Sequence, residues 1–111
     1  MAIRYKVLGQ KAVAANTDWD IYTVSGSKDT VVSSIVVANR DPDNSATYRI
    51  AVRQDNATIT TDMYLAYDVQ ILPASSVALN LGLTMNTDDR LTVRANSSNV
   101  TFNVFGTEID V

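Results

Sequence analysis

The chain has 111 residues, a length typical of one domain, and its 46% of hydrophobic residues is enough for one core and excludes wholesale disorder. Histidine and cysteine are both absent, which excludes disulfides, thiolate metal sites and the most common general base. The net charge is −3 and the nine basic residues are scattered singly, so the sequence offers no concentrated basic face for a nucleic acid.

Short runs rich in β-branched and aromatic residues follow one another along the whole chain, separated by turn residues. This spacing is typical of β-sandwiches and barrels, and no stretch keeps a helical period over several turns. The sequence therefore predicts one all-β domain over residues 1–111, an antiparallel β-sandwich of seven to eight strands, jelly-roll-like or immunoglobulin-like. The predicted strands are Tyr5–Ala14, Trp19–Val24, Val31–Asn39, Thr47–Gln54, Met63–Leu72, a run around Val77–Leu81, Leu91–Ala95 and Val100–Val104.

Three glycines interrupt this pattern. Gly9 falls inside the first predicted strand, where a glycine indicates a bulge or bend. Gly26 lies in the turn at 25–29, and we expect it to take a positive φ there. Gly106 follows the last predicted strand, so we expect it to precede a short tail.

The strongest turn signal is the stretch 40–45, because Pro42 fixes φ and the Asx side chains around it cap local backbone donors. It separates two β-rich runs. We therefore predict that Val31–Asn39 and Thr47–Gln54 form an antiparallel hairpin around this turn.

Hydrophobic and polar residues alternate in the strands, so one set should face the core. Ile35 and Val37 share one face of the most β-branched run, which we expect to be central in its sheet. The predicted core residues are Val77, Leu79, Leu81, Leu91, Val93, Val100, Phe102 and Val104.

Candidate chemistry is limited to pairs of carboxylates, namely Asp18 with Asp20, Asp41 with Asp43, and Asp88 with Asp89. Such pairs run glycoside hydrolysis in some enzymes, and Asp41–Ser45 carries oxygen ligands suited to calcium. The last two pairs lie in predicted turns, where Asp caps the backbone, and the 41–45 stretch lacks the spacing of a calcium loop. No serine lies in a nucleophile-elbow motif. We therefore expect no enzyme activity and no catalytic, cofactor-binding or metal-binding residue.

The aromatic residues offer a second candidate site, a platform on which sugar rings would stack. Its members would be Trp19, Tyr22, Tyr48, Tyr64 and Tyr67. Tyr64 and Tyr67 are three residues apart and should point to opposite faces of a strand, one buried and one exposed. Core packing is the favoured interpretation of these rings, and a carbohydrate-binding module remains an alternative function.

A resemblance along nearly the whole chain suggests a more specific function. The segments that carry it are Thr17–Val24, Val31–Arg40, Thr47–Arg53, Tyr64–Pro73, Leu79–Arg94 and Val100–Ile109. The series resembles small virion-associated structural proteins of tailed bacteriophages, especially those of cyanobacterial and other aquatic hosts. The matching stretches are strand and turn motifs, so no functional residue is carried over. The resemblance implies a particle protein that is made in the cytoplasm of a bacterial host.

The expected function is therefore a non-enzymatic, multi-copy structural component of a tailed-phage virion, mounted on the tail, neck or fibre, with a capsid decoration protein as the alternative. The expected partners are other virion proteins and further copies of the same chain, without nucleic acid, membrane or cofactor. The first residues lack the apolar segment of a signal peptide, and no apolar run has the length of a membrane helix. Self-association is expected because Val31–Ala38 and Ala12–Ala15 carry no charge, and uncharged strands are safe only if they are central in a sheet or covered by another subunit.

Overall fold

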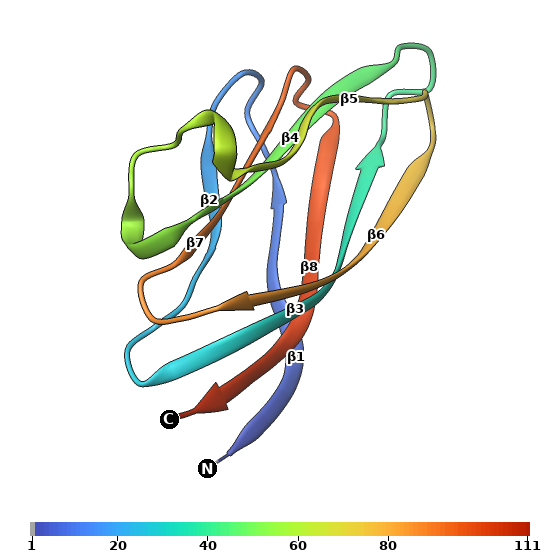
Figure 1. The fold of residues 1–111 in the computed structure, drawn as a ribbon. Helices are drawn as coiled ribbons and strands as arrows, with labels where there is room; N and C mark the ends of the chain where they lie inside the picture. Colours follow the sequence, from blue (N-terminus) through green and yellow to red (C-terminus); the bar gives the residue numbers. More distant parts are fainter. Residues whose placement is uncertain (1) are drawn as a thin grey trace.

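The computed structural model describes residues 2–111, which form eight β-strands and two short 3₁₀ helices (Figure 1). The strands are β1 (Ile3–Ala12), β2 (Trp19–Thr23), β3 (Lys28–Asn39), β4 (Ala46–Arg53), β5 (Tyr64–Ile71), β6 (Ser76–Met85), β7 (Arg90–Ala95) and β8 (Val100–Asp110). The helices η1 (Gln54–Asn56) and η2 (Thr61–Met63) lie in the connection between β4 and β5. The predicted all-β sandwich is confirmed.

The strands form two four-stranded antiparallel sheets. The first sheet has the order β1-β8-β3-β6 and the second the order β2-β7-β4-β5. Only β4 and β5 are both consecutive in the chain and paired in one sheet, whereas every other connection crosses from one sheet to the other. This nested order is that of an eight-stranded jelly roll. Of the two arrangements that the sequence left open, the jelly roll is therefore the correct one.

The predicted hairpin between the third and fourth strands is wrong. β3 pairs with β6 and β8 in the first sheet, and β4 pairs with β5 and β7 in the second. The turn itself exists, because Asp41 Oδ1 accepts the backbone N–H groups of Asp43 at 2.9 Å and Asn44 at 3.1 Å. These local bonds stabilise a change of chain direction but do not determine which sheet the next strand joins. Here the turn forms a corner between the two sheets.

Glycines mark two close approaches of backbone to backbone. The register of β1 on β8 shifts between Val7 and Gly9, which confirms the predicted bulge. A Cβ at Gly9 would overlap the carbonyl oxygen of Ile21, and one at Gly106 would overlap that of Val31. The tail predicted after Gly106 is wrong, because β8 continues to Asp110 with this glycine paired opposite Val32.

The positive φ predicted for Gly26 is also wrong. Among the described residues no glycine has a positive φ, and Ser27 takes that conformation instead, with φ 62°. The turn therefore reverses one residue later than the glycine suggests. No helix in the described part of the chain has the length and apolar character needed to cross a membrane.

The core lies between the two sheets. Five of the eight core residues predicted from the later strands are fully buried there, and they are Leu91, Val93, Val100, Phe102 and Val104. Ile35 and Val37 are buried as well, and β3 lies between β8 and β6, so its predicted central position is confirmed. Val77, Leu79 and Leu81 are only partly buried because β6 is an edge strand.

Candidate binding surface

Two of the three carboxylate pairs have the structural role expected of turn residues. Asp41 caps the corner between β3 and β4, as described above. Asp89 is buried, and its carboxylate accepts the backbone N–H groups of Asn86 at 2.9 Å and Asp55 at 2.8 Å. It thereby fastens the β4–β5 connection to the turn between β6 and β7.

The third pair, Asp18 and Asp20, lies on the outer face of the second sheet. Asp20 receives a hydrogen bond from Arg53 Nη1 at 2.9 Å, and Arg90 Nη1 lies 3.6 Å from its other oxygen. Burial acts to raise the pKa of Asp20, but the Thr92 hydroxyl at 2.7 Å and the arginines together lower it. Asp20 is therefore held as a carboxylate, which is the wrong state for a general acid.

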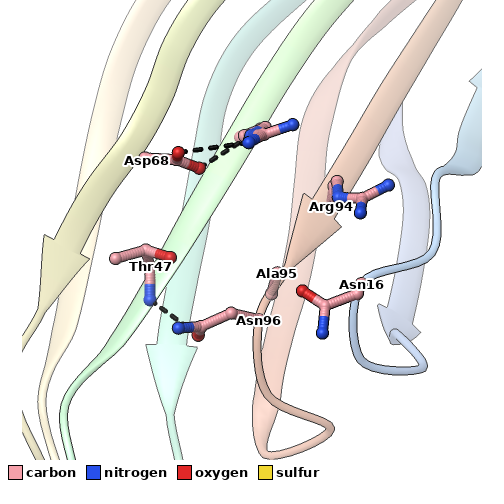
Figure 2. Close-up of a pocket in the computed structure, with 7 residues that line it drawn as sticks. Asn16, Thr47, Asp68, Arg94, Ala95 and Asn96 are labelled. Atoms are coloured by element: carbon pink, nitrogen blue, oxygen red, sulfur yellow. Dashed lines mark hydrogen bonds and ion pairs between the residues drawn. The ribbon is translucent and has the colours of Figure 1, made fainter.

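Charged residues cover the same face nearer to β5. Arg49 Nε and Nη2 donate to the two carboxylate oxygens of Asp68 at 2.7 and 3.1 Å. The Arg49 guanidinium also lies 4.1 Å from the ring centre of Tyr67. Figure 2 shows Asp68 and Arg94 beside a small polar pocket of about 50 Å³, which has room for little more than water. Among the described residues, no group of three or more acidic side chains is placed to hold a metal ion.

The five aromatic residues proposed as a sugar platform are divided between core and surface. Tyr22 and Tyr48 are buried, with the ring of Tyr48 packed edge-on against Phe102. Trp19 is 46% exposed and Tyr67 is 56% exposed. The platform is therefore reduced to the rings on the outer face of the second sheet.

The prediction that Tyr64 and Tyr67 point to opposite faces is wrong. Their ring centres are 4.8 Å apart at an angle of 84°, and both line one hollow on the outer face. The register of β5 on β4 shifts twice, once on each side of Ile50. Each shift adds a residue to β5 and resets the alternation of side chains, so residues three apart reach the same side.

Three shallow hollows follow one another across this face, and residues of the β4–β5 connection line two of them. The first, of about 420 Å³, is lined by Asp18, Trp19, Asp20 and Arg53. The second, of about 480 Å³, shares Asp18 and Arg53 and adds Thr58, Ile59, Tyr64 and Thr92. The third, of about 450 Å³, shares Ile59 and Tyr64 and adds Thr60, Thr61 and Tyr67. Because neighbouring hollows share lining residues, they lie side by side from Trp19 to Tyr67, and we call the three together the groove.

Arg53 fixes the start of the β4–β5 connection, whose residues line part of this groove. Its guanidinium donates to the carbonyl oxygen of Ala57 at 2.8 Å, to Asn56 Oδ1 at 2.9 Å and to Asp20 Oδ1 at 2.9 Å. One side chain thus ties β2, β4 and the connection together. The sequence analysis did not single out Arg53, because its role depends on the fold that brings Asp20 of β2 beside it.

Comparisons with known proteins give structural matches only. No protein-family model matches the chain, and no curated protein matches it. A protein of the IBDV viral particle, a solved structure, matches with a TM-score of 0.53 and 9% identity, over 96% of this chain and 30% of that one. A pentameric capsid protein isolated from metagenomic phage sequences matches in two crystal structures with a TM-score of 0.44 and 23% identity, over 95% of this chain and 60% or 62% of the other. The chain thus spans less than two thirds of each of these proteins, and the likeness to the IBDV protein is one of fold.

Proposed function

We propose that the chain is a non-enzymatic structural protein of a virion, present in many copies. The observation that carries this proposal is the jelly-roll strand order, a fold that recurs in viral capsid domains. The protein of the IBDV particle shares the fold over nearly the whole of this chain. The carboxylates give further support. Asp41 and Asp89 cap backbone N–H groups, and Asp18 and Asp20 form ion pairs with arginines, so each has a structural role.

Within the particle, the proposed position is the tail, neck or fibre of a tailed phage, and capsid decoration is the alternative. The two positions differ in stoichiometry, because a shell has far more equivalent sites than a tail or neck. Quantitative mass spectrometry of purified particles, with the major capsid protein as the internal standard, gives the copy number. Tens of copies or fewer support the tail side, and hundreds support decoration. Absence of the chain from the particle would overturn the virion role.

The proposal includes association with further copies of the chain. The uncharged stretch Val31–Ala38 gives no support to it, because β3 is satisfied on both sides within its own sheet. The support comes from β1, an edge strand whose residues Ile3–Val7 are all exposed. Ile3, Tyr5 and Val7 alternate along it, and Tyr5 is 86% exposed. β1 and β8 lead to the two termini at the same end of the molecule, so this apolar strip lies at one tip (Figure 1).

A further inference from the structure

The groove on the outer face of the second sheet has the composition of a ligand site. Its hollows of about 420, 480 and 450 Å³ each reach the size of small-molecule pockets, and together they form an extended trough. Aromatic rings stand at both ends, with Trp19 at one and Tyr64 and Tyr67 at the other. Between them lie hydrogen-bonding groups, which are the carboxylate of Asp18, the guanidinium of Arg53 and the hydroxyl of Thr92.

The rings of Trp19 and Tyr67 are held in place and stay partly exposed. Lys11 Nζ lies 4.2 Å from the centre of the Trp19 ring, and Arg49 lies 4.1 Å from that of Tyr67. Each cation occupies one face of its ring, yet about half of each aromatic residue stays exposed. A flat ligand with C–H groups can therefore stack on the remaining surface of both rings.

The carboxylates of Asp18, Asp20 and Asp68 all have arginine partners, which bears on the class of ligand. The pairs are Asp18 with Arg94, Asp20 with Arg53 and Arg90, and Asp68 with Arg49, at N···O distances between 2.7 and 3.6 Å. An anion that binds one of these arginines would have to compete with its carboxylate, and a cation would have to displace an arginine from a carboxylate. Hydroxyl groups, in contrast, bond to the open sides of such pairs without breaking them.

The groove is also preorganised. Arg53 fastens the start of the β4–β5 connection through Asn56 and Ala57, and the buried carboxylate of Asp89 holds the backbone of Asp55. This reduces the free energy that a ligand loses in ordering the loop, because the start of the loop is already tied to β4 and to the turn between β6 and β7.

We propose that this groove binds a neutral oligosaccharide. The sugar rings stack on Trp19 and Tyr67 at the two ends, and hydroxyl groups between them bond to Asp18, Arg53 and Thr92. This proposal does not depend on the virion role. A particle protein need not bind glycans, and a glycan-binding protein need not belong to a particle.

The test uses the whole chain against an array that contains neutral and acidic glycans, followed by titration with the neutral hexasaccharides of cellulose, chitin, starch and mannan. Trp19 is the only tryptophan, so its fluorescence reports directly from the groove. We expect a saturable change in that fluorescence with at least one neutral oligosaccharide. Trp19→Ala and Tyr67→Ala, followed by calorimetry, should each weaken binding by at least about tenfold.

Tyr5→Ala is the matched control, because it removes an exposed aromatic ring from the first sheet, away from the groove. It should leave glycan affinity unchanged. Trp19 and Tyr67 are surface residues, so their truncation leaves the core intact, and circular dichroism checks this. Binding to acidic glycans alone, binding that survives both groove substitutions, or no binding at millimolar sugar would each overturn the proposal. None of these results bears on the copy number of the chain in a particle.

Discussion

The hydroxyl of Tyr22 donates a hydrogen bond of 2.6 Å to Glu108 Oε2, and this bond joins β2 of the second sheet to β8 of the first. Thr30 Oγ1 lies 2.7 Å from the same hydroxyl, and Lys6 Nζ lies 3.2 Å from the other oxygen of Glu108. Tyr22, Thr30 and Glu108 are all buried. The sandwich is therefore closed at this point by a polar link between its sheets.

Removing the hydroxyl of Tyr22 should weaken the fold. Tyr22→Phe keeps the ring but leaves Glu108 and Thr30 short of a partner inside the protein, at an expected loss of about 1–3 kcal/mol in the free energy of unfolding. Urea titration measures the loss. Tyr67→Phe, which removes an exposed hydroxyl, is the control and should change stability by less than about 0.5 kcal/mol. Equal stability of the two variants would mean that water replaces the link without loss.

The same pair should make stability depend on pH at both ends of the scale. The hydrogen bond from Tyr22, with help from Lys6, holds the pKa of Glu108 below its ordinary value of 4.5. The unfolded chain therefore takes up this proton first, and stability is lost as the pH falls below 4.5. Burial and the bond to Glu108 raise the pKa of Tyr22 from 10 to about 12. The unfolded chain then loses this proton first, so stability is also lost as the pH rises above 10.

Urea titrations over a pH series measure both slopes. Glu108→Gln should flatten the acid slope and Tyr22→Phe should flatten both, because Tyr22 is the main cause of the shift at Glu108. An acid slope that Tyr22→Phe leaves unchanged would show that the hydroxyl does not control this carboxylate.

Replacing Gly106 of β8 should lower the stability of the fold. A Cβ at Gly106 would collide with backbone atoms of Val31 and Val32, which cannot move without disturbing the centre of the first sheet. Gly106→Ala should therefore cost about 1–3 kcal/mol or more through overpacking. Gly82→Ala in β6, where a Cβ meets nothing within 4 Å, is the matched control and should stay within about 0.5 kcal/mol of the parent. Thermal unfolding of the two variants side by side tests the difference.

Phe102 lies at the centre of the core, fully buried and packed edge-on against Tyr48 of the opposite sheet. Phe102→Ala should destabilise the protein by about 3–5 kcal/mol, because the cavity it leaves is walled by both sheets and cannot collapse without moving one of them. Urea titration measures this loss, and a value under about 1 kcal/mol would be incompatible with the packing described.

The sequence predicted the features that depend on local alternation, and it failed where distant strands decide the outcome. Phe102 and Val93 could be assigned to the core because each alternates with polar neighbours, and the alternation has the same period in any β-sandwich. The hairpin around Pro42 was wrong because an Asx turn has the same local bonds at a hairpin and at a corner between sheets. The shared face of Tyr64 and Tyr67 depends on shifts in the pairing of β5 with β4, which no pattern within β5 reveals. The groove was therefore unpredictable as a unit, although its aromatic residues were singled out one by one.

Self-association should depend on the apolar strip of β1. An edge strand offers unpaired backbone groups, and Ile3, Tyr5 and Val7 place exposed apolar side chains beside them, so contact between copies would cover both. Sedimentation equilibrium at micromolar concentration should therefore show species heavier than the 12.1 kDa monomer. Tyr5→Asp should shift the population to the monomer, because it places a charge in the contact, while Tyr67→Asp, at an exposed site on the other sheet, should not. Tyr5 is 86% exposed, so its replacement does not disturb the core, and an intact circular dichroism spectrum verifies that the variant is folded. A wild-type chain that sediments as a single 12.1 kDa species at every concentration would refute association of the free protein.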